Sequence, residues 1–174
     1  ISALVEIVSS TLNAIIAAES SIRIAILGIA FVDCDQEMER RTGVSIPTIF
    51  DIEGEDGFRK REIEILSDVS SGSGMVIATG GGVIMREENR RVLKESGVVV
   101  YLTASVNKLV RRTRNSKTRP LLQQGDPEQR IRQLMLEREP LYQEVADLVV
   151  EVDDRSPQFI AHRLNEAIEK HENT

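Results

Sequence analysis

The sequence MVIATGGG, residues 75–82, gives the clearest indication of the fold. Its first five residues do not alternate between polar and apolar, which is typical of a strand buried on both faces of a parallel sheet. Three glycines follow directly, and backbone without side chains can approach a ligand closely and direct N–H groups at an anion or a hydroxyl. The alternative interpretation of the glycines is a flexible turn with no binding role.

Further apolar runs alternate with helical patterns on both sides of this stretch. The other predicted strands are 3–8, which could also be helical, 29–32, 98–102 and 148–152. The predicted helices are 11–28, 36–41, 46–70 with an interruption at 54–57, 86–96, 106–114, 128–138 and 156–169. Strands that alternate with helices predict an α/β domain whose parallel sheet is covered by helices on both faces.

Length and composition narrow the class of protein. With 174 residues, 41% of them hydrophobic and 29% charged, the chain fits one globular domain over 1–174. A net charge of −6 argues against nucleic acid as the main partner. No apolar run approaches the roughly 18 residues that span a membrane. Residues 1–21 lack a basic start and carry Glu6, so no signal peptide is expected.

The single cysteine, Cys34, excludes an internal disulfide and is typical of a reducing cytoplasm. We therefore expect a cytoplasmic monomer that acts on a small molecule and has no nucleic-acid or membrane partner.

The stretch FVDCDQEMERRTGVSIPTIFDIEGEDGFRKRE, residues 31–62, places charged groups at a second strand end. Asp33 and Asp35 follow a short apolar run, and Arg59 lies at the head of a charged helix. Ligands of parallel sheets bind beyond the carboxyl ends of the strands, where both aspartates and the three glycines are predicted to lie. The pattern indicates a small-molecule site, and the alternative is a solvated acidic turn beside a surface helix.

Two further arginines are candidates for ligand binding. Arg119 lies in a basic, polar loop at 115–126, which favours a lid whose guanidinium groups neutralise phosphate charge, although simple solvation is the alternative. Arg138 precedes Pro140, which we expect to end or kink a helix. An arginine at such a break can face a pocket, and an ion pair with a neighbouring glutamate is the alternative.

Five motifs, taken together, resemble the shikimate kinase family. They are FVDCD (31–35), FDIEGEDGFR (50–59), ATGGG (78–82), RPLL (119–122) and REPLY (138–142). Their order and spacing match from about residue 31 to the C-terminus. The resemblance implies a P-loop kinase fold of the nucleoside-monophosphate-kinase type, with three α/β/α layers and a five-stranded parallel sheet. It also implies a substrate-binding region at about 33–62 and a lid loop at about 112–126.

The resemblance further implies transfer of the ATP γ-phosphate to the 3-hydroxyl of shikimate, in aromatic amino-acid biosynthesis. Asp35 would bind the substrate hydroxyls and act as the general base, while Arg59 and Arg138 would hold the substrate carboxylate. The residues assigned to shikimate in this way are Asp35, Arg59, Gly80, Gly81, Gly82 and Arg138.

On the nucleotide side, the resemblance assigns Asp33 to Mg²⁺ through water. It assigns Arg119 to the phosphates as a second catalytic residue, and Arg155 to the adenine side. Phe50, Phe58 and Glu62 would support the wall of the site.

One family motif, the phosphate-binding loop G-x-x-x-x-G-K-[ST], has no counterpart. It should fall at 10–17, where the chain reads STLNAIIA, with no glycine before Gly28 and no lysine before Lys60. Such a stretch cannot form a glycine-dependent phosphate nest or supply the lysine charge. A catalytically inactive, shikimate-binding relative is therefore one alternative, and a related small-molecule kinase such as a gluconate kinase is another. The retained Asp33, Arg119 and lid-like loop favour the kinase.

Overall fold

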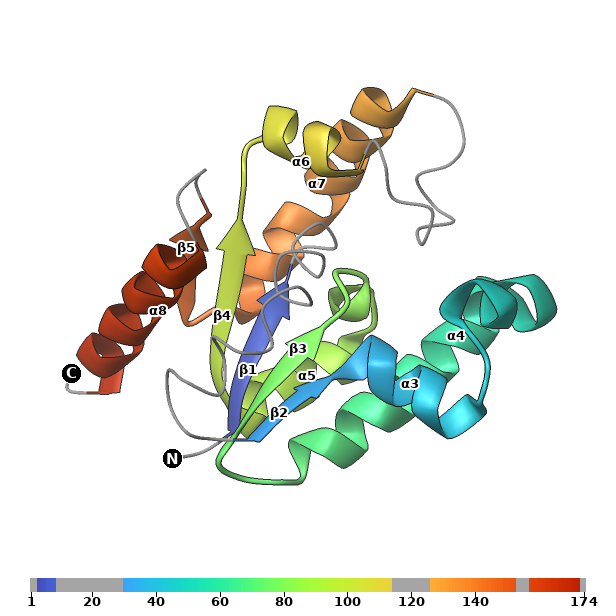
Figure 1. Ribbon diagram of the computed structural model, residues 1–174, viewed down its shortest axis with the longest axis horizontal. Helices are drawn as coiled ribbons and strands as arrows, with labels where there is room; N and C mark the ends of the chain where they lie inside the picture. The colour runs from blue at the N-terminus through green and yellow to red at the C-terminus, as the bar shows by residue number, and fades with distance from the viewer. Residues whose placement is uncertain (1–2, 9–29, 114–125, 153–156, 173–174) are drawn as a thin grey trace.

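A five-stranded parallel sheet forms the centre of the structure (Figure 1). The computed structural model describes residues 3–8, 30–113, 126–152 and 157–172. The strands are β1 (Ala3–Val8), β2 (Ala30–Asp33), β3 (Met75–Thr79), β4 (Gly97–Thr103) and β5 (Leu148–Glu151). Their order in the sheet is β2-β3-β1-β4-β5, and each pairing is parallel. All five predicted strands are confirmed, with ends that differ by a residue or so.

Helices pack on both faces of this sheet. They are α3 (Cys34–Thr42), α4 (Ile46–Ser70), α5 (Glu87–Ser96), α6 (Val106–Thr113), α7 (Pro127–Val145) and α8 (Pro157–Glu172), with a short 3₁₀ turn η1 (Val83–Met85). The predicted helix at 11–28 and nearly all of the predicted loop at 115–126 lie outside the described residues.

The period-two geometry of the strands places two clusters of the core on opposite faces of the sheet. Ile77, Val99 and Tyr101 point to one face, where they join buried side chains of α3, α4, α5 and α7. Their chain neighbours Val76 and Val100 point to the other face and pack with α8. Because successive side chains of a strand alternate between faces, an apolar run without alternation requires cover on both sides. The predicted three-layer arrangement is confirmed.

A bend in α4 sets the direction of its second half. Gly54 has φ 69° and ψ −174°, a backbone conformation that interrupts the helix and that glycine adopts at little cost. Across the bend, Arg61 donates to both carboxylate oxygens of Glu53, at 2.8 and 2.6 Å. The predicted interruption is therefore confirmed at Gly54, and Phe58 and Arg59 lie on the part of α4 that follows it.

The helix predicted at 128–138, which Pro140 was expected to end or kink, does not end there. α7 continues through this proline to Val145. The residues beyond it are held by the core, because Tyr142 and Val145 are both buried against the sheet. Tertiary packing of this kind outweighs the hydrogen bond that a proline removes from a helix.

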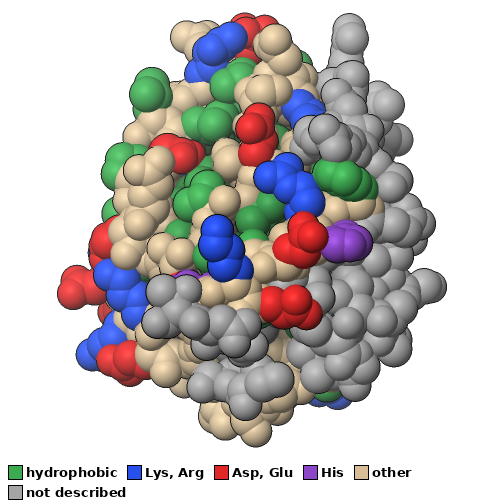
Figure 2. Space-filling view, turned by 90° about the vertical axis from the view of Figure 1, so that its left-hand side faces the viewer, with side chains coloured by type: hydrophobic (Ala, Val, Ile, Leu, Met, Phe, Trp, Pro, Cys, Tyr) green, Lys and Arg blue, Asp and Glu red, His purple; other side chains and the backbone are tan. Residues whose placement is uncertain are grey.

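The described surface carries charges of both signs. Within the described ranges, no helix combines the length and the hydropathy that a bilayer crossing requires. On the face that carries β5 and α8, basic and acidic side chains are interspersed (Figure 2). The charges on the described part of this face are therefore mixed (Figure 2).

Replacement of Leu93 by Ala tests the core described above. Leu93 of α5 is fully buried in the larger cluster, so Leu93→Ala should lower the free energy of unfolding by about 2–5 kcal/mol. Urea unfolding followed by circular dichroism measures it. Leu136→Ala is the matched control, because Leu136 of α7 is 80% exposed and its loss should cost less than about 0.5 kcal/mol. Equal losses of unfolding free energy in the two variants would contradict the packing described here.

Candidate active site

The three glycines after β3 form a tight turn that leads into η1. The amide of Val83 donates to the carbonyl of Gly80 at 3.1 Å, and the amide of Met85 donates to that of Gly82 at 3.0 Å. Gly81 and Gly82 are buried. This glycine turn, residues 80–82, lies beyond the carboxyl end of β3, where ligands bind in parallel sheets.

Two side chains of α5 hold the segment that follows the glycine turn. Asn89 donates from Nδ2 to the carbonyl of Val83 at 3.0 Å, and Arg90 donates from Nη1 to that of Ile84 at 2.9 Å. The sequence analysis did not single out either residue. Asn89 lies four positions before the buried Leu93 and so shares its face of α5, which was the available signal.

Arg59 of α4 brings a buried positive charge against the glycine turn. Its side chain is 5% exposed, and its guanidinium fills the space that a Cβ at Gly82 would occupy. Glu62 and Glu55 accept hydrogen bonds from it at 2.8 and 3.1 Å, and the Phe58 ring centroid lies 5.1 Å from its Cζ. Burial acts to lower the pKa of Arg59, but Glu62 and then Glu55 outweigh it and the pKa is raised. The group is therefore a fixed cation.

Two carboxylates face the first glycine of the turn. A Cβ at Gly80 would lie 3.5 Å from Oδ1 of Asp35 and 3.6 Å from Oε1 of Glu62. Burial raises the pKa of Glu62, and the charges of Arg59 and Arg138 oppose that rise. The sequence analysis placed Glu62 only in the supporting wall, whereas the structure puts its carboxylate at the glycine turn beside Asp35.

Arg138 of α7 reaches the glycine turn from the other side. It is 7% exposed, and its Nη1 donates to the carbonyl of Gly81 at 3.2 Å. Its Nε is buried and makes no hydrogen bond within the described part of the chain. The neighbouring Glu137 and Glu139 accept hydrogen bonds from Gln133 and Tyr101 instead. A buried donor without a partner is costly, so this atom favours an anionic ligand beside Arg138.

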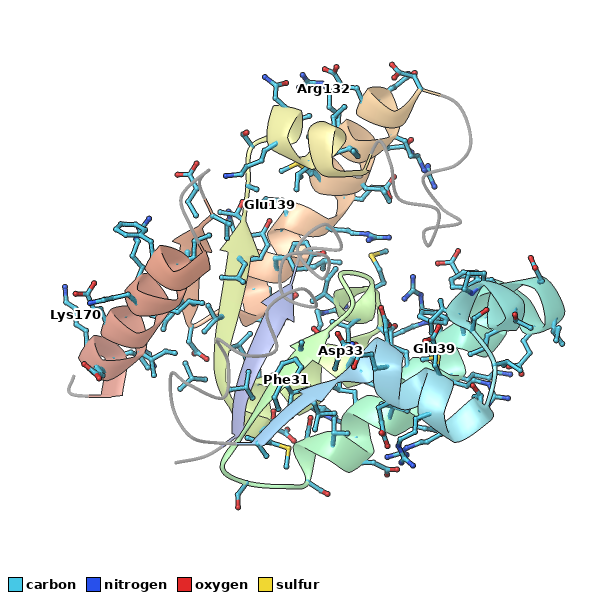
Figure 3. All side chains as sticks on the ribbon, viewed as in Figure 1. Phe31, Asp33, Glu39, Arg132, Glu139 and Lys170 are labelled. Atoms are coloured by element: carbon cyan, nitrogen blue, oxygen red, sulfur yellow. The ribbon has the colours of Figure 1, made fainter. Side chains whose placement is uncertain are left out.

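Asp33 lies at the junction of β2 and α3 (Figure 3). Its Oδ1 caps α3 by accepting from the amides of Asp35 and Gln36, at 2.9 and 3.0 Å. This cap fixes the first turn of α3 and with it the position of Asp35. Among the described residues, no group of three or more His, Cys, Asp or Glu side chains could hold a metal ion.

Two predicted site residues cannot be placed. Arg119 and Arg155 lie outside the described residues, as does the stretch 10–17 where a phosphate loop would fall.

A stacked pair of tyrosines supports the turn and was also missed by sequence reasoning. The rings of Tyr101 on β4 and Tyr142 on α7 are 4.5 Å apart and inclined by 12°. The hydroxyl of Tyr142 donates to the carbonyl of Gly81 at 2.5 Å, and that of Tyr101 donates to Glu139 at 2.6 Å. Tyr142 belongs to the motif REPLY, but that motif was interpreted through Arg138 alone.

The strand order, the three layers and a site beyond the carboxyl ends of the strands define the class as a P-loop kinase fold. A family model described as shikimate kinase matches residues 24–169. The chain belongs to the shikimate kinase family. The match begins after residues 10–17, so the stretch without a phosphate-loop motif lies outside it.

Individual relatives agree with this assignment. The chain is similar to the shikimate kinase of Nitrosospira multiformis, with 53% identity over 134 residues that cover 77% of this chain and 69% of that protein. It is 51% identical over 144 residues to the shikimate kinase of Pseudomonas aeruginosa, covering 83% and 84%. The solved structure of Acinetobacter baumannii shikimate kinase in complex with shikimate superposes with a TM-score of 0.93 at 37% identity, covering 100% and 96%.

The tyrosine pair yields a spectroscopic prediction, because the chain has only two tyrosines. Burial raises the pKa of Tyr142 to about 12 and raises that of Tyr101 as well. The tyrosinate absorbance of the native protein should therefore stay low at pH 10, where the unfolded chain is half ionised. Since both folded pKa values lie above the unfolded one, their contribution to stability is present below pH 10 and is lost as the pH rises beyond it. A native titration in which half of the signal appears near pH 10 would contradict the burial.

Proposed function

We propose that this chain phosphorylates the 3-hydroxyl of shikimate with ATP. The observation that carries the proposal is the convergence of two buried guanidiniums on adjacent glycines, Arg59 at Gly82 and Arg138 at Gly81, with the carboxylate of Asp35 at Gly80. Two fixed cations beside a carboxylate suit a small molecule that carries one carboxylate and several hydroxyls. The family and the relative solved with shikimate support the same substrate over gluconate.

The substrate carboxylate would lie between the two arginines. A hydrogen bond from the carboxylate to Nε of Arg138 would stabilise the complex most, because this buried donor has no partner in the described protein. Arg59 is already paired with Glu62 and Glu55, so its guanidinium is held in place before the substrate arrives. The site is in this sense pre-formed, which lowers the ordering cost of binding.

Asp35 would act on the substrate hydroxyl. Its carboxylate accepts the hydroxyl proton as the oxygen attacks the γ-phosphorus of ATP, the bond from phosphorus to the β-phosphate oxygen breaks, and ADP leaves. The glycine turn brings backbone within reach of the same molecule because it has no side chains. In this proposal the substrate-binding region spans about 33–62, and a lid at about 112–126 excludes water from the transfer.

The nucleotide side is proposed on family membership and on the residues retained there. Mg²⁺ in such enzymes needs few protein ligands, because substrate phosphates and water supply most of its oxygens. One oxygen of Asp33 caps α3, so this side chain fits a metal held through water rather than a full coordination shell. Arg119 would neutralise charge at the phosphates, and Arg155 would line the adenine side.

A second candidate function rests on the sequence STLNAIIA at 10–17, which lacks the glycines and the lysine of a phosphate loop. A shikimate-binding protein without kinase activity would retain the described site and fail to bind nucleotide. Calorimetric titrations with shikimate and with Mg-ATP separate the two, because only the kinase binds both.

Replacement of Asp35 by Asn tests the proposed base. Asp35→Asn keeps the shape of the side chain and removes its ability to take a proton, so kcat should fall about a hundredfold or more in a coupled ADP-release assay. Asp68→Asn is the matched control, because Asp68 lies near the end of α4, its side chain is 63% exposed, and it pairs with Arg41. Unchanged turnover in Asp35→Asn would contradict its assignment as the base.

Replacement of Gly82 by Ala tests the placement of Arg59. The backbone of Gly82, at φ −93° and ψ −10°, suits any residue, so the added methyl group acts only by displacing the guanidinium. We expect KM for shikimate to rise about tenfold or more, as for the loss of one charge-assisted hydrogen bond. Gly72→Ala is the control, because its methyl group would displace only the flexible end of Met75 and would meet the Val69 carbonyl oxygen at an ordinary contact distance of 3.4 Å. A Gly82→Ala protein with normal KM would rule out this role of Arg59.

A further inference from the structure

We propose that Tyr142 is a positioning residue for the substrate carboxylate, acting through the Gly81 carbonyl and Arg138. The inference rests on the proposed function, because it concerns the same site. It assigns a binding role to a side chain that otherwise belongs to the core between β4 and α7.

Tyr142 and Arg138 share one acceptor. They lie four residues apart on α7 and therefore on the same side of the helix. The Tyr142 hydroxyl donates to the carbonyl of Gly81 at 2.5 Å, and Nη1 of Arg138 donates to the same oxygen at 3.2 Å. A carbonyl oxygen has two lone pairs, so these two bonds satisfy it completely. The shorter bond, from Tyr142, is the stronger restraint on the position of the glycine turn.

The phenol of Tyr142 is held as a proton donor. Burial raises its pKa to about 12, although the nearby charge of Arg138 opposes the rise. The hydroxyl is therefore protonated at any pH at which the protein works. It donates its proton to the Gly81 carbonyl, and no tyrosinate anion forms that would pair with Arg138 in place of the substrate carboxylate.

The ring of Tyr142 has little freedom to move. The ring of Tyr101 on β4 stacks on it with centroids 4.5 Å apart, a contact that does not involve the Tyr101 hydroxyl. The hydroxyl of Tyr142 is thereby fixed relative to both the helix and the sheet.

The consequence for binding concerns Nε of Arg138, the buried donor that has no partner in the described part of the chain. With Gly81 held by Tyr142, the bond from Nη1 of Arg138 to Gly81 is at the long end of the hydrogen-bond range, 3.2 Å, and the buried Nε remains for a ligand. Without the hydroxyl, Arg138 becomes the sole described side chain that donates to the Gly81 carbonyl, which draws its guanidinium toward the backbone. The loss should fall on recognition of the carboxylate and spare the rest of the substrate.

Tyr142→Phe removes the hydroxyl and keeps the ring. We expect its Kd and KM for shikimate to rise roughly tenfold, the effect of one buried hydrogen bond. KM for ATP, and Kd for the neutral carboxamide of shikimate, should change less than about twofold, because neither depends on a carboxylate at Arg138. Calorimetry supplies both Kd values, and urea unfolding checks that the variant is folded.

Tyr101→Phe is the matched control. It deletes the other hydroxyl of the stacked pair, which bonds Glu139 and not the glycine turn, so Kd for shikimate should stay within about twofold of wild type. An Arg138→Lys background supplies a second measurement, in which the effect of Tyr142→Phe on Kd should shrink because the two residues act on one oxygen.

Several results would overturn the inference. They are equal losses for shikimate and its carboxamide, a Tyr101→Phe effect as large as that of Tyr142→Phe, and full additivity with Arg138→Lys. Wild-type protein that binds shikimate without turnover would remove the proposed kinase function, while the calorimetric comparison would still decide the role of Tyr142. Wild-type protein that binds no shikimate would overturn both.

Discussion

Burial of the Arg59 guanidinium against the glycine turn is the interaction on which the site depends. A charge removed from water is costly unless acceptors replace the lost hydration, and Glu62 at 2.8 Å is the buried acceptor that does so. The arrangement needs glycine at 82, because a methyl group there would occupy the space of the guanidinium. Arg59 itself lies on the second half of α4, five residues after the bend at Gly54.

The same glycine turn receives the second cation from an element distant in sequence. Arg138 and Tyr142 on α7 hold Gly81, while Asn89 and Arg90 on α5 hold the carbonyls of the residues just beyond. The turn is therefore restrained from several helices at once, although its glycines are intrinsically the most flexible residues of the chain. Such restraint is what a site needs if it is to present fixed donors to a carboxylate.

The sequence predicted the sheet well and the restraints on the site poorly. Apolar runs such as 75–79 identify buried strands because their pattern is local, and the residue pattern singled out Asp35, Arg59 and Arg138, whose roles the resemblance supplied. Pro140 was misjudged because core packing beyond it maintains the helix. Tyr142 and Asn89 were missed because their importance comes from a bond to a backbone carbonyl, and although spacing places Asn89 on the buried face of α5, it does not identify that bond.

The most direct test of the account is to incubate the purified chain with Mg-ATP and shikimate and to identify the products by phosphorus NMR. The account predicts that ADP and a shikimate phosphorylated at the 3-hydroxyl appear in equal amounts. It also predicts that neither forms when shikimate is omitted. If calorimetry detects shikimate binding but the shikimate remains unphosphorylated, the central claim is contradicted and the chain is a shikimate-binding protein without kinase activity.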